Sequence, residues 1–416
     1  MLPTFVNLQH QEKCQMPKIA IIGAGAAGCF CAIEVKRRCP EAYVTVYEAA
    51  ARPLAKVAIT GGGRCNFTNS FEDITRLEEA YPRGARLMKR ALRAFSNQDA
   101  MAWFEREGVP YVIQEDRCVF PRSQDAMQIV GTLTRLMQSL GVKLNCGCRI
   151  ESVIRDGDAF KLQMQDGCET AGIVVVTTGG GALKLLEPLA LEIEKPVPSL
   201  FTFKVEDESL RALMGIVAGR ASVSLAGTQF KASGPLLITD WGLSGPAALK
   251  LSSYAARHLA ENGYKGSILV NWTGWSEDEA RSFIKTAAAS QGRKLVANVA
   301  PEGINARLWK HLLSRAGLRP ELIWAELGSK GANKLVNAIC ADAYPLAGRC
   351  HFKAEFVTCG GVALTNINPG TMEAKAHPGL YFAGEVLDID AITGGFNLQA
   401  AWSTAYMVAS AISRKQ

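Results

Sequence analysis

The sequence predicts an α/β protein in which a discontinuous Rossmann-like domain is interrupted by a β-rich domain that carries a small helical insertion. An apolar strand at residues 18–22 enters the glycine-rich turn Gly23-Ala-Gly25-Ala-Ala27-Gly28, and helical and strand-like patterns alternate from there to about residue 190. The chain becomes strand-like again after about residue 349 and ends in a helix. Its 416 residues also exceed the roughly 250 to 300 at which a single core stops growing.

The glycine-rich turn predicts a dinucleotide site. Gly23 permits a tight turn, Gly25 lets a diphosphate approach the backbone, and Gly28 lets the helix pack closely on the strand. Glu48 follows a second strand, residues 43–47, where a carboxylate can accept hydrogen bonds from ribose hydroxyls. That carboxylate would repel a 2'-phosphate, so FAD or NAD is favoured over NADP. The alternative is a glycine-rich turn without a ligand.

The remaining elements follow from periodicity. We expect a flexible extension at residues 1–16, a dinucleotide-binding domain at 17–190 and 350–416, and an inserted β-rich domain at 191–349 with a helical subdomain at about 276–342. The helical patterns cover residues 84–107, 123–140, 276–289, 304–316, 321–327, 333–339 and about 398–412. The strand-like segments are residues 142–146, 150–154, 160–164, 173–176, 200–205, 221–225, 236–239 and 267–272. Ser276 and Glu279 are spaced as a capping box.

The composition is that of a globular protein and argues against a membrane-spanning, disulfide-stabilised or zinc-binding protein. With no run of about 18 apolar residues, we predict no membrane segment. The twelve cysteines are too dilute for a disulfide scaffold and form no zinc pattern, so we expect reduced thiols, a cytoplasmic protein and no metal. The net charge of +7 comes from scattered residues, so a solvated surface is favoured over nucleic-acid binding.

Two C-terminal motifs favour FAD over NAD. The strand at residues 380–382 ends in Gly384-Glu385, which in two-part FAD folds brings a carboxylate to the ribityl chain or the diphosphate. The turn at residues 393–397 precedes the last helix, whose free N–H groups and positive end suit the N1 and C2 carbonyl of a reduced, anionic flavin. The alternative for this turn is a capped helix that follows a glycine turn.

A third stretch, residues 60–69, contains three consecutive glycines, which cost backbone entropy unless something approaches closely. We interpret it as a loop along the diphosphate and the isoalloxazine, with Lys56 or Arg64 offsetting negative charge. Cys65 has no CxxC partner, so a contact role is favoured over a redox role.

These stretches, with residues 234–237 and 242–246, resemble a bacterial flavoprotein family, the NAD(P)/FAD-dependent oxidoreductases of the aminoacetone-oxidase-like type. The resemblance extends from residue 17 to the end of the chain. It implies a Rossmann-like FAD-binding domain interrupted by a β-barrel-like domain with a helical insertion. Three residues depart from the family pattern, which usually has His, Gly and Tyr there: Asp240, Ala391 and Phe396. Because Asp240 and Trp241 are expected to face the active-site cleft, the substrate stays open.

By this resemblance the cofactor-binding residues fall into three groups. The adenosine diphosphate half would contact Gly23, Gly25, Ala27, Gly28, Glu48 and the backbone of Ile150. The middle of the cofactor would contact Lys56, Arg64, Cys65, Asn66, Thr178 and Gly179. The ribityl chain and the flavin ring would contact Gly384, Glu385, Asp388, Gly395, Phe396, Asn397 and Leu398.

The predicted function is FAD-dependent hydride transfer between flavin N5 and a small organic substrate, by amine oxidation or enone reduction. The five histidines are isolated in sequence, so no catalytic base is assigned. No second glycine fingerprint follows a strand, so NAD(P)H would bind only transiently over the flavin. Two alternatives are a flavin-loaded redox sensor with a basic helical insert and an RNA-modifying flavoprotein. The oligomeric state is not defined by the sequence.

Overall fold

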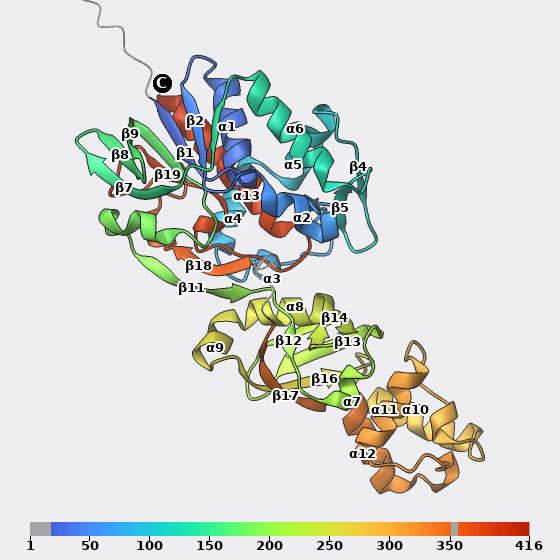
Figure 1. Cartoon of the computed structure of the whole chain (residues 1–416). Coiled ribbons are helices and arrows are strands. Elements are labelled where there is room, and N and C mark those ends of the chain that lie inside the picture. The colour runs from blue at the N-terminus through green and yellow to red at the C-terminus, as the bar shows by residue number, and fades with distance from the viewer. Residues whose placement is uncertain (1–17, 351–356, 416) are drawn as a thin grey trace, which may run out of the picture.

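The computed structural model describes residues 18–350 and 357–415 (Figure 1), so the extension expected at residues 1–16 lies outside the described part. Two hydrophobic cores organise the chain. Residues within 19–189 and 362–412 form the first, which we call the sheet unit, and residues within 201–346 form the second, the barrel unit. The predicted fold class is confirmed: a discontinuous Rossmann-like unit is interrupted by a six-stranded barrel with a helical insertion.

The sheet unit is built on a five-stranded parallel sheet of order β19-β10-β1-β2-β6. Its strands are β1 (Ile19–Ile22), β2 (Val44–Glu48), β6 (Lys143–Cys146), β10 (Ile173–Val176) and β19 (Leu380–Phe382). The central strands β1 and β10 consist almost entirely of Ile and Val and are buried throughout, because helices cover the sheet. Helices α1 (Ala26–Arg38) and α13 (Phe396–Lys415) pack against each other.

The C-terminal segment completes this unit. Strand β19 pairs with β10, and β18 (Val357–Val362) pairs antiparallel with β11 (Ile193–Ser199) near the junction of the two units (Figure 1). Two further antiparallel sheets have the orders β3-β5-β4 and β7-β8-β9. The remaining elements are α2 (Ala55–Gly63), β3 (Thr68–Asn69), α3 (Leu77–Ala80), α4 (Ala85–Ala94), α5 (Asn97–Arg106), β4 (Tyr111–Ile113), β5 (Cys118–Pro121), α6 (Ala126–Ser139), β7 (Ile150–Asp156), β8 (Ala159–Met164), β9 (Gly167–Ala171), η1 (Leu183–Leu189), η4 (Leu364–Asn366) and η5 (Gly384–Val386).

The barrel unit closes in the order β12-β15-β14-β13-β16-β17. Its elements are β12 (Phe203–Lys204), α7 (Glu208–Arg211), β13 (Val217–Leu225), β14 (Lys231–Ile238), β15 (Gly242–Ser244), α8 (Gly245–Tyr254), α9 (Ala256–Glu261), β16 (Lys265–Asn271) and β17 (Asp342–Arg349). The helical insert lies between β16 and β17, at the end of the barrel away from the sheet unit (Figure 1). It contains α10 (Glu277–Ser290), η2 (Val296–Asn298), α11 (Ala306–Arg315), η3 (Trp324–Glu326) and α12 (Gly328–Cys340).

Local structure corrects several predicted elements. The helical pattern at residues 84–107 is two helices, because Phe95 is extended and Ser96 begins α5 with a capping box to Asp99. The segment 321–327 is helical only in η3, since its backbone instead bonds to residues 292–296. The last helix begins at Phe396, about two residues earlier than predicted, and the strand predicted at 200–205 is reduced to β12.

Candidate dinucleotide site

In the turn between β1 and α1, two glycines are required by close packing and a third leaves open space. A Cβ at Gly23 would lie 2.6 Å from the carbonyl oxygen of Thr177, and a Cβ at Gly28 would lie 1.9 Å from that of Gly23. These two glycines are therefore required by packing. A Cβ at Gly25 would meet nothing within 4 Å. Gly25 is the N-cap of α1 and has no side chain to cap it, so open space faces the first-turn N–H groups. That geometry suits a diphosphate.

Glu48 is held at the end of β2 by two backbone groups. Its Oε2 accepts a hydrogen bond from Ala24 N, and its Oε1 accepts one from Ala50 N, each at 2.8 Å. Each oxygen keeps a further lone pair that could accept from a ribose hydroxyl. The backbone of Glu48 also accepts from Cys148 N at 2.8 Å, which places the approach to β7 and Ile150 beside it. Two of the six residues predicted for the adenosine half, Glu48 and Ile150, are thus brought near each other.

Two residues predicted for the middle of the cofactor, Lys56 and Gly179, meet Glu385, which was predicted for the ribityl chain and the flavin ring. Lys56 Nζ lies 3.4 Å from Glu385 Oε2, and Glu385 Oε1 accepts from Thr358 N at 2.8 Å. A Cβ at Gly179 would lie 3.5 Å from Glu385 Oε2 and 3.8 Å from Lys56 Nζ. Gly179 has a φ of +71°, and Thr178, which precedes it, is the second residue after the end of β10. The sheet therefore brings a lysine, a carboxylate and a glycine turn together at its carboxyl edge.

The three consecutive glycines form an irregular end to α2. Gly61, Gly62 and Gly63 have φ values of +61°, +68° and +83°, a region that side-chain-bearing residues rarely adopt. A Cβ at Gly62 or Gly63 would meet nothing within 4 Å. Arg64 follows them, is exposed, and lies 4.4 Å over the ring of Phe120. This segment thus offers open backbone and a cation on the surface.

Cys65 and Asn66 face inward. Cys65 is fully buried at a φ of +60°, and burial raises the pKa of its thiol to about 12. A protonated, inaccessible thiol is a poor redox group, and the predicted contact of Cys65 with the cofactor stays a prediction. The side chain of Asn66 is also buried, and its Oδ1 accepts a hydrogen bond from Val119 N at 3.2 Å.

The start of α13 lies against this segment. A Cβ at Gly395, whose φ is +88°, would lie 2.3 Å from the carbonyl oxygen of Thr68 and 2.6 Å from Asn66 Oδ1. The carbonyl of Gly394 accepts from Asn69 Nδ2 at 2.9 Å. The positive end of the longest helix in the described part of the chain is therefore placed beside the glycine-rich segment.

The first side chains of α13 are largely used within the protein. Asn397 bonds Ala391 in both directions, accepting from its N–H at 2.9 Å and donating to its carbonyl at 3.1 Å. Phe396 is buried edge-on against Phe71, at 5.0 Å between ring centroids, and Tyr81 donates to its carbonyl at 2.8 Å. Contact between these two residues and a ligand would therefore come mainly from the backbone.

Two more predicted residues meet where η5 approaches α1. Gly384 has a φ of +75°, and a Cβ there would lie 3.0 Å from Ala27 Cβ. Its N–H donates to Thr404 Oγ1 in α13 at 2.9 Å. Leu398, the third residue of α13, is half-buried. Gly384 therefore serves close packing between the C-terminal segment and the first helix.

Asp388 lies apart from this group. Both of its carboxylate oxygens accept from Arg257 Nη2 at 2.8 Å, and Arg257 belongs to α9 in the barrel unit. The structure thus places Asp388 in an ion pair between the units, and its predicted contact with the flavin stays a prediction.

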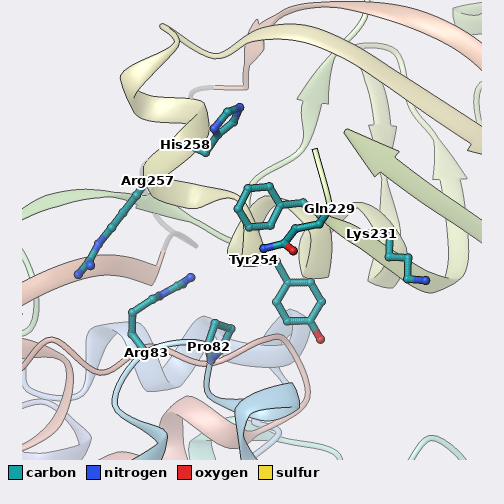
Figure 2. A pocket seen from close by; sticks show the side chains of 8 residues that line it. Pro82, Arg83, Gln229, Lys231, Tyr254, Arg257 and His258 are labelled. Carbon is teal, nitrogen blue, oxygen red and sulfur yellow. The ribbon is translucent and has the colours of Figure 1, made fainter. Parts of the chain in front are cut away.

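A cavity of about 480 Å³ lies between the two units near this ion pair (Figure 2). Arg83, on the sheet-unit side, donates from Nε to Asp390 Oδ1 at 2.7 Å and from Nη1 to the carbonyl of Ser253 at 2.7 Å. Asp390 is fully buried. Its signal in the sequence is an acidic residue within an otherwise apolar stretch. The cavity is lined by Pro82, Arg83, Gln229, Phe230, Lys231, Tyr254, Arg257 and His258.

Asp240 and Trp241, expected at the cleft, form the turn between β14 and β15. Arg211 Nε donates to the carbonyl of Asp240 at 2.6 Å, and Val205 N donates to that of Trp241 at 2.9 Å. Neither residue lines the cavity between the units. Their predicted place in the active site stays a prediction.

Two negative findings apply to residues 18–350 and 357–415. Within these ranges, no three or more His, Cys, Asp or Glu side chains gather in a way that could hold a metal ion. In the same part of the chain, none of the helices combines the length and the apolar character needed to cross a membrane.

Comparison with known proteins gives a family and relatives. The family described as HI0933-like protein Rossmann domain matches residues 17–411. A 3-dehydro-bile acid delta(4,6)-reductase from Clostridium scindens is 26% identical over 416 residues, covering 96% of this chain and 100% of the relative. A ribosomal RNA dihydrouridine synthase from Haemophilus influenzae is 29% identical over 411 residues, covering 95% and 98%.

Among solved structures, a 3-ketosteroid-delta4-(5alpha)-dehydrogenase from Rhodococcus jostii RHA1 is similar in fold. Its TM-score is 0.52 at 14% identity, with 97% of this chain and 98% of that chain covered. At this identity the likeness concerns the fold alone.

Proposed function

The chain belongs to the HI0933-like Rossmann family of FAD-dependent oxidoreductases, and from that premise we propose that it reduces a carbon–carbon double bond conjugated to a carbonyl group. The observation that carries this proposal is the chemistry shared by the two relatives' names. A 3-dehydro-bile acid with delta(4,6) unsaturation is a conjugated ketone, and uridine has a ring double bond conjugated to a ring carbonyl. Enone reduction is therefore favoured over amine oxidation.

The geometry described above fits FAD. The open space at Gly25 and the uncapped start of α1 would hold the diphosphate, and Glu48 would hold the ribose. Lys56 with Glu385 would contact the middle of the cofactor, and the backbone at Gly395 the flavin ring. When bound, FAD supplies hydride chemistry at its N5 position.

The residues of the chain contribute charge stabilisation and exclusion of side reactions. Reduction of a conjugated double bond moves negative charge toward the carbonyl oxygen, so nearby donors lower the barrier. The start of α13 and the exposed guanidinium of Arg64 are the two positive features beside the glycine-rich segment. Cys65 is buried and protonated, so it does not supply a competing thiolate. We propose NADH or NADPH as a transient electron donor.

The direct test is an absorption spectrum of the purified protein, followed under anaerobic conditions. We expect a flavin band that NADH or NADPH bleaches and that a conjugated enone then restores. A colourless protein, or a flavin reduced by simple amines and by neither nicotinamide nucleotide, would contradict the proposal.

A variant links the spectrum to the predicted site. The Cβ of Gly25→Val would meet nothing within 4 Å, and its methyl groups would narrow the space before α1, so we expect a folded protein with FAD affinity reduced at least about tenfold, which is about 1.4 kcal/mol. Gly131→Val is the matched control, because a Cβ at Gly131 in α6 also meets nothing within 4 Å. Fluorescence titration of FAD with each apoprotein measures the difference. Equal affinities would show that the diphosphate lies elsewhere.

A further inference from the structure

Helix α4 has a face made of cations. Leu87, Met88 and Ala91 of this helix are buried in the core of the sheet unit. The opposite side carries four exposed cations at spacings of three and four residues, which line up along one face. They are Arg86, Lys89, Arg90 and Arg93.

This pattern is unfavourable for the helix alone. Within the part of the chain that the structure describes, none of the four side chains forms an ion pair, and the sequence has no Asp or Glu between Glu79 and Asp99. Like charges three and four residues apart repel each other. Arg86 also lies in the first turn, where the positive end of the helix disfavours a cation. The arrangement therefore points to an anion outside the chain.

The helical insert, which looked basic in the sequence, uses several of its cations internally. Arg315 pairs with Asp342 at 2.8 Å, and His311 is buried with its Nε2 3.0 Å from Tyr344 OH. Arg319 forms an ion pair with Glu326. The four cations of α4 have no such internal role.

We propose that the exposed face of α4 is a docking surface for RNA, which would carry the unsaturated base to be reduced. The identity of the reacting base rests on the function proposed above, whereas the docking surface does not. Three of the four cations are arginine, whose planar guanidinium binds phosphate through two parallel hydrogen bonds. The stripe from Arg86 to Arg93 is about 10 Å long, enough to follow consecutive phosphates along a strand.

The position of α4 supports the same partner. Arg83, which lines the cavity between the units, precedes α4 by two residues, so α4 begins close to this cavity. A membrane is less suitable, because an amphipathic helix binds lipid by inserting its apolar face, and the apolar face of α4 is buried in the core.

The test measures RNA binding by the FAD-loaded protein. A fluorescein-labelled, uridine-containing RNA hairpin is titrated at several salt concentrations with wild type and with R86Q/K89Q/R90Q/R93Q, which keeps helix-forming side chains. We expect at least about tenfold weaker binding by the variant and a log–log salt slope less steep by about 3, as four lost phosphate contacts predict. The matched control is K285Q/K310Q/K330Q/K334Q, which removes four exposed lysines of the insert and should bind within about twofold of wild type.

Circular dichroism, FAD content and reduction by NAD(P)H of the same preparations separate the two proposals. Failure of flavin reduction with α4-dependent RNA binding intact would sink the proposed reaction and leave the docking surface standing. Salt-independent or absent RNA binding by wild type, or equal weakening by the insert variant, would overturn the docking surface. Binding of phosphatidylserine vesicles through α4 in place of RNA would also overturn it. If the fourfold variant loses its fold, R90Q/R93Q is used, with an expected slope change of about half.

Discussion

Helices α1 and α10 begin in opposite ways. Gly25 precedes α1 and offers no side chain, while open space lies in front of it. Ser276 precedes α10, its Oγ accepts from Glu279 N at 3.3 Å, and its own N–H donates to Glu279 Oε2 at 2.7 Å. The first helix has no side-chain cap at the place where we propose that the diphosphate binds, and the second satisfies its first N–H groups with its own side chains. The contrast separates the helix end that we propose binds a ligand from one that is capped within the fold.

The largest expected effect comes from adding a side chain at Gly28, in the glycine-rich turn between β1 and α1. In Gly28→Ala the new Cβ would lie 1.9 Å from the carbonyl oxygen of Gly23 and 2.6 Å from Thr177 Oγ1. Because backbone atoms cannot move aside cheaply, we expect the free energy of unfolding to fall by about 3 kcal/mol. Urea denaturation of the apoprotein measures this change. Gly131→Ala in α6, whose Cβ meets nothing within 4 Å, should be neutral or slightly stabilising. A Gly28→Ala protein as stable as wild type would refute the packing role.

An intermediate effect is expected at the other helix. Ser276→Ala removes the N-cap of α10 and should lower the free energy of unfolding by about 1 kcal/mol. FAD affinity should be unchanged, because α10 lies in the insert, far from the glycine turn (Figure 1). Thermal unfolding and FAD titration of one preparation check both statements. A weakened FAD affinity would contradict the proposal that the start of α1 binds the cofactor and the start of α10 only stabilises the fold.

The smallest expected effect is a pH dependence of the stability of the first turn of α10. Hydrogen bonds from the backbone N–H and the hydroxyl of Ser276 lower the pKa of Glu279 below its ordinary value. A carboxyl group whose folded pKa is depressed contributes stability above its unfolded pKa, and this contribution is lost as the pH falls through the folded pKa. Amide protection factors in the first turn of α10 should therefore decrease in acid. The cap of α11, Asn305, accepts from Arg307 N at 2.9 Å and does not titrate, so α11 is the internal control. An equal decrease of amide protection in α10 and α11 would exclude protonation of Glu279 as the cause.

Features of the chain that depend on neighbouring residues were predictable from the sequence. The glycine turn and strand β1 follow from local spacing, and the capping box at Ser276 was recognised by its residue types. The break between α4 and α5 has the same kind of signal, Ser96 followed by Asp99, but it lies within a continuous helical periodicity. Hydrophobic periodicity alone does not register a short interruption when both helices bury the same kind of face.

Contacts between distant segments were beyond local reasoning. Arg83 and Asp390 are separated by 307 positions and meet only because the C-terminal segment returns to the sheet unit. The pairing of Lys56 with Glu385 was anticipated only as two residues near one cofactor, through the family resemblance. The barrel was likewise implied only by that resemblance, and its strand order was not predicted, since strand-like segments do not specify their partners.

The return of the C-terminal segment also has a consequence for biosynthesis. Strand β19 and helix α13 leave the ribosome after the entire barrel and its insert, yet they complete the sheet that begins at residue 19. Translation at about 5 to 20 residues per second therefore leaves β10 without its partner β19 for many seconds while the barrel can already fold. Because we propose that FAD also contacts residues 384–398, its binding would be complete only after this C-terminal segment has been synthesised.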